Sequence, residues 1–385
     1  MLDFEYCNPT HISFGKNKIA ELDKLIPADA RVLILLGGNS AKKTGTLDEV
    51  ITALGNRNIT EFSGIEANPT YETLIQAIDI IKEQDIDFLL AVGGGSVIDG
   101  TKFVAAAALF EGEPWDILLN WGNNITQALP FGSVLTLPAT GSEMNSGSVI
   151  TRKDIQSKRS FMSDHVFPKF SILDPSKTFT LPERQVANGV VDAFVHIIEQ
   201  YLTYPVNAPV QDRFSEGLLQ TLIELGPQAL SNPKDYDIRA NLMWVATMAL
   251  NGLIGRGVPH DWATHMIGHE LTALYDIDHA RTLAIVLPGL LDCQRESKKE
   301  KLLQYGERVW NITQGTETQR IDDAIAKTRT FFEDMGIKTR LSDYDLNYTH
   351  VEEIIKKLEY HGMTALGEHQ DIDLEKSRHI LERNL

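Results

Sequence analysis

Apolar residues in the first half of the chain gather in short continuous runs bounded by glycine, proline or aspartate. The runs cover residues 31–36, 87–92, 132–137 and 169–173. This pattern is typical of strands that are buried on both faces. Segments with helical spacing of apolar residues, such as 71–84 and 96–109, lie between them. The alternation predicts a parallel sheet with helices on both faces, in which ligands bind beyond the carboxyl ends of the strands.

The pattern changes near residue 181, after which helical segments follow and no comparable strand-like run occurs. A capping-box pattern from Thr180 to Glu183 is expected to open the first of these helices. Further helices are expected at 210–230, 238–252, 260–275, 298–310, 318–335 and 350–359. A chain of 385 residues is too long for one ordinary core. We therefore predict an α/β domain at 1–180 and an all-helical domain at 181–385, with the functional site where the halves meet.

One helical segment, residues 186–202, carries an acid and an imidazole among apolar neighbours. Asp192 and His196 stand four residues apart, which places both side chains on one face of a helix. Apolar residues such as Val190 and Phe194 surround them, so the helix is expected to be buried. Two polar groups in such a helix are costly unless they pair with each other or bind a metal. Both interpretations fit this segment when it is taken alone.

A second histidine pair, His265 and His269, has the same helical spacing, and His279 follows in a segment expected to be a loop. Glu270 comes after the pair and not inside a His-Glu-x-x-His pattern, which argues against a zinc protease. One carboxylate from Asp192 and three imidazoles suit Zn²⁺ or Fe²⁺ and leave a position for substrate. A lone histidine is more often a satisfied core residue, but several candidate ligands together favour a divalent metal.

Three glycine-rich turns follow predicted strands. They are Gly37-Gly38-Asn39-Ser40, Gly93-Gly94-Gly95-Ser96 and Pro138-Ala139-Thr140-Gly141-Ser142. Glycine lets the backbone approach a ligand closely, and a following helix offers free N–H groups to a pyrophosphate. None of the turns matches GxGxxG or a Walker loop, and each by itself is also compatible with an ordinary connection. Three such turns at successive strand ends favour a dinucleotide site.

The first turn predicts which nicotinamide cofactor is used. NAD sites commonly place Asp or Glu at the end of an early strand to hold the ribose 2′-hydroxyl, and this carboxylate repels a 2′-phosphate. No acid occurs between the strand at 31–36 and Asp48, whereas Ser40, Lys42 and Lys43 offer a hydroxyl and two cations. We therefore predict NADPH over NADH.

The composition disfavours several classes of partner. The formal net charge of −17 would be repelled by nucleic acid and by anionic membranes, so neither partner is expected. Cys7 and Cys293 form no disulfide framework and have no metal-type spacing. A reducing, cytoplasmic location is expected. We identify no signal-peptide pattern and no stretch of about 18 apolar residues that would span a membrane.

The chain resembles the iron-containing (group III) alcohol dehydrogenases, most closely their NADPH-dependent aldehyde reductase or butanol dehydrogenase branch. The resemblance extends from residue 11 to residue 374. Its most specific parts are Gly93-Gly-Gly-Ser-Val-Ile-Asp99, Leu137-Pro-Ala-Thr-Gly-Ser-Glu143, Gly189-Val-Val-Asp-Ala-Phe-Val-His196, Trp262-Ala-Thr-His-Met-Ile-Gly-His-Glu270 and His279. It implies a Rossmann-like N-terminal domain, an all-helical C-terminal domain as in dehydroquinate synthase-like folds, and a homodimer.

The resemblance also implies roles for individual residues. The metal ligands, for Fe²⁺ or Zn²⁺, would be Asp192, His196, His265 and His279. His269 would line the site, either as a proton donor or as an orienting group. The NADP(H) contacts would be Gly37, Gly38, Ser40, Asn68, Gly94, Gly95, Ser96, Asp99, Thr136, Thr140, Ser142 and Lys158.

Together these features predict a metal-dependent reductase of small aldehydes to primary alcohols, which is also an alcohol dehydrogenase in reverse. The main rival is a cyclase of the dehydroquinate synthase type on the same scaffold. Such an enzyme needs basic residues for a phosphorylated substrate, and no basic cluster stands beside the candidate ligands. A metallohydrolase would leave the three glycine-rich turns without a role. A non-enzymatic binding protein is a more remote alternative.

Overall fold

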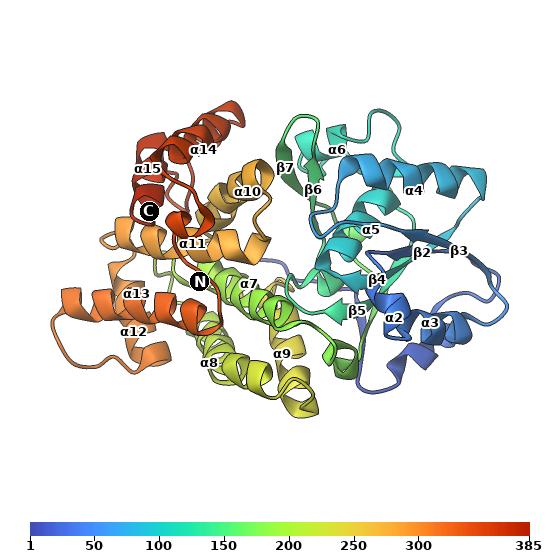
Figure 1. Ribbon diagram of the computed structural model, residues 1–385, viewed down its shortest axis with the longest axis horizontal. Coiled ribbons are helices and arrows are strands. Elements are labelled where there is room, and N and C mark those ends of the chain that lie inside the picture. Colours follow the sequence, from blue (N-terminus) through green and yellow to red (C-terminus); the bar gives the residue numbers. More distant parts are fainter. The chain divides into compact units, whose positions relative to one another are not determined.

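A computed structural model describes all residues from 1 to 385, which divide into two compact units (Figure 1). The first, here called the sheet unit, contains Cys7–Leu181 and Pro233–Thr247. The second, here called the helical unit, contains Met1–Tyr6, Pro182–Asn232 and Met248–Leu385. The division into domains at 1–180 and 181–385 stays a prediction, because compactness does not show which segments fold independently.

Six parallel strands form the main sheet of the sheet unit, in the order β1-β8-β5-β4-β2-β3. They are β1 (His11–Phe14), β2 (Arg31–Leu36), β3 (Asn58–Ser63), β4 (Phe88–Gly94), β5 (Phe131–Leu137) and β8 (Phe170–Leu173). The four predicted apolar runs correspond to β2, β4, β5 and β8, which confirms the parallel α/β prediction. The strand β3 was not predicted from its pattern, because this edge strand is half polar and buries only Phe62 fully.

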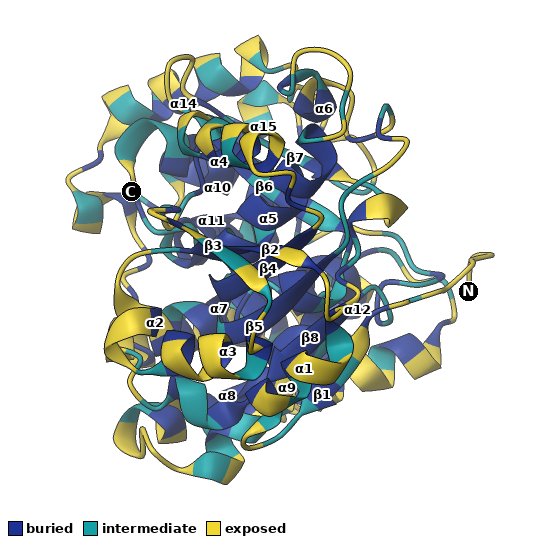
Figure 2. Ribbon diagram, turned by 90° about the vertical axis from the view of Figure 1, so that its right-hand side faces the viewer, coloured by how far each residue is buried: buried dark blue, intermediate teal, exposed yellow.

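Alternate residues of the strands enter two separate cores on opposite faces of the sheet. Leu35 and its neighbours on one face pack with α4 and α5, whereas Ile34 and its neighbours on the other face pack with α1 and α3. These helices are α1 (Leu22–Leu25), α3 (Thr46–Leu54), α4 (Tyr71–Glu83) and α5 (Gly95–Ala107). Figure 2 colours the central strands as buried and the outer side of α3 as exposed.

The remaining elements of the sheet unit are shorter or lie outside the main sheet. They are α2 (Ser40–Lys43), α6 (Asp116–Leu119), the antiparallel pair β6 (Gly147–Arg152) and β7 (Ser157–Met162), and most of α9 (Tyr236–Ala249). Five 3-10 turns complete the chain: η1 (Lys18–Glu21), η2 (Ser142–Met144), η3 (Asp164–Val166) and η4 (Pro175–Thr178) in this unit, and η5 (Leu341–Tyr344) in the helical unit.

The helical unit contains no strand and is built around α7. Its helices are α7 (Glu183–Tyr201), α8 (Pro209–Ser231), α10 (Ala263–Tyr275), α11 (His279–Cys293), α12 (Lys299–Trp310), α13 (Glu317–Asp334), α14 (Tyr348–Tyr360) and α15 (Leu374–Glu382). The helix α7 is buried along most of its length and packs against α8 and α11. The prediction of a helical second half is confirmed. No helix of the chain combines the length and the apolar character that crossing a bilayer requires.

Two local predictions in this half were wrong. Thr180 is exposed and caps nothing, since α7 begins after Pro182 and makes no side-chain capping bond. The segment from His279 onward is not a loop but the helix α11. Pro288 lies inside this helix, although a proline in the interior of a helix normally breaks it. Packing of α11 against four other helices keeps it helical and buried.

Candidate active site

Three helices of the helical unit carry the predicted metal and catalytic residues. Asp192 and His196 lie on α7, His265 and His269 lie on α10, and His279 is the first residue of α11. Because α11 packs against both α7 and α10, the three helices bring these side chains together. Four of the five residues are at most 6% exposed, whereas the side chain of His279 is 23% exposed. The group is therefore buried, with its most open side at His279.

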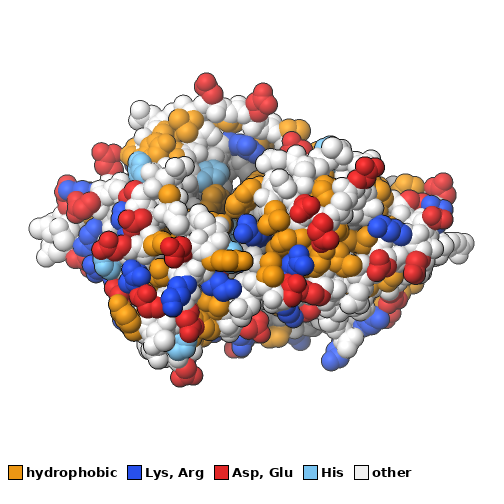
Figure 3. Space-filling view, turned by 90° about the horizontal axis from the view of Figure 1, so that it is seen from above, with side chains coloured by type: hydrophobic (Ala, Val, Ile, Leu, Met, Phe, Trp, Pro, Cys, Tyr) orange, Lys and Arg blue, Asp and Glu red, His pale blue; other side chains and the backbone are white.

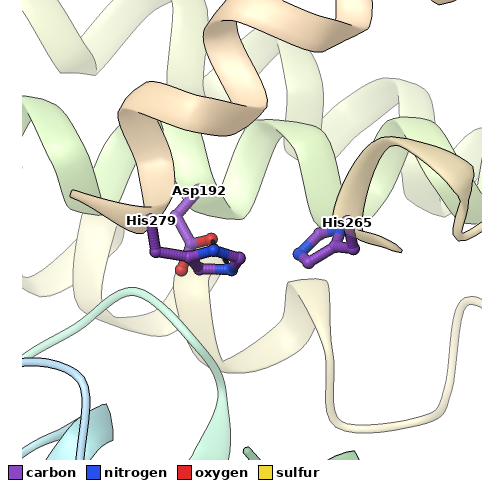
Figure 4. Close-up of side chains that lie close together, drawn as sticks. All are labelled: Asp192, His265 and His279. Carbon is purple, nitrogen blue, oxygen red and sulfur yellow. Dashed lines mark ion pairs between the residues drawn. The ribbon is translucent and has the colours of Figure 1, made fainter. Parts of the chain in front are cut away.

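Figure 4 shows the imidazole of His279 beside the Asp192 carboxylate, with the ring of His265 facing them from the other side. His279 Nε2 lies 3.7 Å from Asp192 Oδ1. One ligand atom from each of these three residues lies within 4.8 Å of the other two. His196 adjoins them, since its Nε2 atom lies 3.1 Å from His265 Nε2 and its Nδ1 atom 3.9 Å from Asp192 Oδ1.

This donor set fits a divalent metal. With bonds of about 2.0–2.2 Å, the ligand atoms of a tetrahedral site lie roughly 3.4 Å apart, close to the 3.7 Å between His279 Nε2 and Asp192 Oδ1. His196 lies outside the group of three whose ligand atoms gather within 4.8 Å, so its role as the fourth ligand stays a prediction. Asp192 Oδ1 is buried and accepts no hydrogen bond. A carboxylate oxygen in this position is costly unless a cation faces it. One carboxylate and several imidazoles suit Zn²⁺ or Fe²⁺.

His269 lies one turn from His265 on α10, and its ring centroid is 5.3 Å from that of His279. It thus borders the candidate ligands. Whether His269 passes a proton to substrate or only orients its neighbours stays an open prediction, because the position is compatible with both roles.

One residue of this site was missed in the sequence. Glu199 lies on α7, on the same face as Asp192 and His196, and its carboxylate contacts both the backbone N–H and the ring Nδ1 of His265. Burial, followed by the nearby Asp261 carboxylate, raises the pKa of Glu199 well above its ordinary value. The spacing of 192, 196 and 199 along one helix face was the signal that could have identified it.

The predicted cofactor residues belong to the sheet unit and cluster at the carboxyl ends of β2, β4 and β5. Gly37 and Gly38 follow β2, Ser40 begins α2, Gly94 ends β4, Gly95 begins α5, and Ser96 follows in its first turn. Thr136 lies in the last part of β5, and Thr140 and Ser142 follow that strand. Asp99 lies on α5, and Lys158 on β7 donates a hydrogen bond of 3.0 Å to Asn68 Oδ1. In a parallel sheet these strand ends lie along one edge.

The second and third glycine-rich turns approach each other closely. A Cβ atom at Gly95 would collide with the Thr140 hydroxyl, so only glycine lets the two turns come this near. The Ser96 hydroxyl donates to the carbonyl of Ala67, which ties α5 to the segment that holds Asn68. The second and third turns and the segment that holds Asn68 therefore meet at the start of α5.

Asp99 and Ser142, both predicted cofactor contacts, bond to each other and to further protein groups. Asp99 Oδ1 accepts from the Ser142 hydroxyl at 2.5 Å, and Asp99 Oδ2 accepts from the Val149 N–H at 3.0 Å. The Ser142 hydroxyl also accepts from Lys102 Nζ at 2.8 Å. Lys102 is fully buried and donates further to Asn145 Oδ1 and the carbonyl of Gly147. The burial of Lys102 was not predicted, because nothing in the sequence distinguishes it from an exposed lysine on a helix.

Known proteins match this chain over its full length. A model of the iron-containing alcohol dehydrogenases matches residues 9–175, and the C-terminal model of the Fe-containing alcohol dehydrogenase family matches residues 186–384. The NADPH-dependent aldehyde reductase YqhD of Escherichia coli K12 is 60% identical over 384 residues, which are 99% of either chain. A probable NADH-dependent butanol dehydrogenase of Bacillus subtilis is 41% identical over 100% of both chains.

The crystal structure of E. coli K-12 YqhD matches with a TM-score of 0.99, covering 100% of this chain and 99% of that one. Sequence, fold and the buried carboxylate–histidine cluster thus agree. The chain belongs to the iron-containing alcohol dehydrogenase family.

Proposed function

We propose that this protein is an NADPH-dependent aldehyde reductase that converts small linear aldehydes to primary alcohols and catalyses the reverse oxidation. The reaction consumes an aldehyde, NADPH and a proton and yields an alcohol and NADP⁺. The observation that carries the proposal is 60% identity over nearly the whole chain to an NADPH-dependent aldehyde reductase. The buried cluster of Asp192, His265 and His279 supports the proposal, because these three residues could hold a metal ion.

The chain's own residues have separate tasks in this reaction. Asp192, His196, His265 and His279 would hold the divalent metal, which when bound supplies Lewis acidity toward the aldehyde oxygen. The glycine-rich turns at the start of α5 would hold NADPH, whose nicotinamide supplies the hydride. Their backbone N–H groups suit a pyrophosphate. His269, next to the ligands, is the candidate for delivering the proton that completes the alcohol.

No observation favours the rival cyclase activity. A phosphorylated substrate would require free cations beside the metal ligands. The two arginines near the start of α11, Arg184 and Arg281, instead share the Asp278 carboxylate, at 2.8 and 3.5 Å. A neutral aldehyde needs no such cation.

The test is the loss of NADPH absorbance in the presence of butanal or propanal, with and without a metal chelator. The untreated enzyme is expected to oxidise NADPH, and chelation is expected to remove most of the rate, which added metal restores. Sugar phosphates turned over far better than butanal would favour the cyclase-like scaffold, and full activity after verified metal removal would exclude the proposed chemistry.

His265→Ala is expected to lower turnover more than about 100-fold, because even residues that only orient metal ligands cost 10- to 100-fold when changed. Binding of NADPH, measured by its fluorescence, should be nearly unchanged, since the glycine-rich turns lie in the other unit. His379→Ala, at an exposed histidine on α15, is the matched control and should keep full activity. Near-normal turnover by metal-free His265→Ala would contradict the assigned site.

We also propose that the protein is a cytoplasmic homodimer. Large apolar side chains are exposed in the first six residues, with Leu2 at 47% and Phe4 at 50%. Exposed apolar residues that lie together commonly mark an interface. Two scattered cysteines without a disulfide agree with a reducing compartment.

A further inference from the structure

Glu199 is the residue of α7 whose side chain contacts the Nδ1 side of His265. It is 3% exposed and lies one helical turn after His196. Its Oε1 atom accepts from the His265 backbone N–H at 3.1 Å, and its Oε2 atom contacts the ring Nδ1. Both carboxylate oxygens therefore contact His265.

This contact determines which ring nitrogen of His265 carries the proton. A carboxylate accepts hydrogen bonds, so the nitrogen facing it, Nδ1, is the one that donates. The Nε2 atom is then left with its lone pair. That atom lies 3.1 Å from His196 Nε2, inside the candidate metal cluster. A neutral imidazole binds a metal only through such a lone pair.

The chain segment that leads into α10 is fixed to the same part of α7. The Asp261 N–H donates to the Glu199 carbonyl at 2.8 Å, and Asp261 Oδ1 accepts from the Ala263 N–H. The buried Lys298 pairs with Asp261 Oδ2 at 2.9 Å and with Glu368 at 2.6 Å. Lys298 thus offsets the negative charge of Asp261, which would otherwise oppose the Glu199 carboxylate nearby.

We propose that Glu199 is a positioning residue that sets the tautomer and the orientation of His265 and thereby raises the affinity of the site for its metal. The proposal rests on the metal-dependent function proposed above. In this proposal α7 supplies two metal ligands, Asp192 and His196, and also the carboxylate that orients a third ligand, His265. Glu199 would act through His265, the residue that its carboxylate contacts.

Glu199→Gln is the decisive variant, because glutamine has nearly the same shape but only one acceptor oxygen. If that oxygen accepts the backbone N–H of His265, the amide NH₂ faces Nδ1 and forces it to accept. The proton then moves to Nε2, where it blocks the metal. We expect the dissociation constant for Zn²⁺, measured by competition with a chromophoric chelator, to rise 10- to 100-fold.

The control is Glu216→Gln, a buried glutamate on α8 of the same unit that contacts Tyr201, Arg213 and Gln304 but none of the histidines. Its Zn²⁺ affinity should equal that of the unmodified protein. Thermal unfolding of the metal-free proteins separates positioning from a general packing role. Positioning predicts that Glu199→Gln keeps nearly the metal-free melting temperature and loses the rise that saturating Zn²⁺ produces in the unmodified protein.

Wild-type affinity in Glu199→Gln, or an equal loss in Glu216→Gln, would overturn the proposal. Absence of Zn²⁺ binding by the unmodified protein would instead overturn the metal site itself, so the two failures are distinguishable. Should Glu199→Gln not fold, Glu199→Asp keeps the carboxylate but shortens its reach by one methylene. That variant is expected to bind Zn²⁺ at least about threefold more weakly, and unchanged affinity would contradict the role of Glu199.

Discussion

At the scale of single residues, Gly38 is the position that we predict to decide which cofactor fits the turn after β2. A Cβ atom at this position would meet nothing within 4 Å, so the turn has room for a side chain. An acid here would hold a ribose 2′-hydroxyl and repel a 2′-phosphate. Lack of space therefore does not explain why this position has no acid. Without an acid, the turn does not repel a 2′-phosphate.

The unmodified enzyme is expected to prefer NADPH over NADH at least about tenfold in kcat/KM, which corresponds to about 1.4 kcal/mol. Gly38→Asp should narrow or reverse that preference. Gly217→Asp, at an exposed helical glycine that also has open space, is the matched control and should leave it unchanged. Equal use of both cofactors by the unmodified enzyme would show that this interpretation of the turn is wrong.

The lysines after this turn are a weaker part of the same argument. Lys42 Nζ lies 2.9 Å from Glu61 on β3, so its charge is shared with a carboxylate. Both side chains are well exposed, and such pairs are worth little in water. Lys42 thus remains able to turn toward a phosphate, although the pair was not foreseen from the sequence.

At the scale of elements, α5 depends on one buried cation. Lys102 links α5 to the segment 142–147 through three hydrogen bonds of 2.7–2.8 Å. The carboxylates of Asp99 and Glu143 also lie near it and stabilise its charge. Burial raises the pKa of both acids, and the nearby charge of Lys102 opposes that rise by stabilising their carboxylates. The third glycine-rich turn is held against α5 by this group.

Lys102→Met is expected to destabilise the protein by about 3–5 kcal/mol, the usual result of removing one partner from a buried charge pair. Urea denaturation followed by fluorescence measures the change. Lys82→Met, at an exposed lysine of α4, is the control and should cost less than about 0.5 kcal/mol. A cost for Lys102→Met as small as that of the control would show that the buried network contributes little.

The stabilisation by Lys102 should also depend on pH. Burial lowers the pKa of Lys102 from its ordinary 10.5 to about 8. Between these two pH values the folded protein binds fewer protons than the unfolded chain, so the free energy of unfolding rises with pH. The cost of burying the charged ammonium is fully present below a pH of about 8 and disappears as the pH rises. The difference in unfolding free energy between the unmodified protein and Lys102→Met should grow from pH 8 to pH 10. A constant difference would contradict the lowered pKa.

At the scale of the whole molecule, the surface carries many charges of both signs and a net charge of −17. Figure 3 shows acidic and basic side chains interspersed with apolar ones on one face. A net charge of this size favours solubility and disfavours indiscriminate association. A specific homodimer must therefore rest on a local apolar contact, for which the exposed first residues are the candidate.

Light scattering is expected to give twice the chain mass of 43.0 kDa. Leu2→Asp combined with Phe4→Asp should shift the protein toward the monomer, because each change places a charge in the proposed contact. Tyr360→Asp removes a tyrosine that is 78% exposed at the end of α14 and is the control. A monomeric unmodified protein would contradict the proposed dimer, and a stable dimer of the double variant would place its interface elsewhere.

The sequence by itself determined the parallel sheet, the helical second half and the identity of the candidate ligands. Residues 32–36 are fully buried, and a short apolar run bounded by turn residues is typical of a strand that is buried on both faces. The four-residue spacing of Asp192 and His196 similarly determines a shared helix face. The hairpin of β6 and β7 was missed, because its strands mix polar and apolar residues without a clear period.

Only the tertiary structure decided which of these groups meet. His196 and His265 are 69 residues apart, yet their Nε2 atoms lie 3.1 Å from each other. The contact of Glu199 with His265 depends on α11, which packs against both α7 and α10. The sequence pattern did not predict this helix, which contains Pro288. Local periodicity records which face of an element is buried, but not which other element covers it. Only long-range packing aligns the ring of His265 with the Glu199 carboxylate and brings the separate polar residues together in one site.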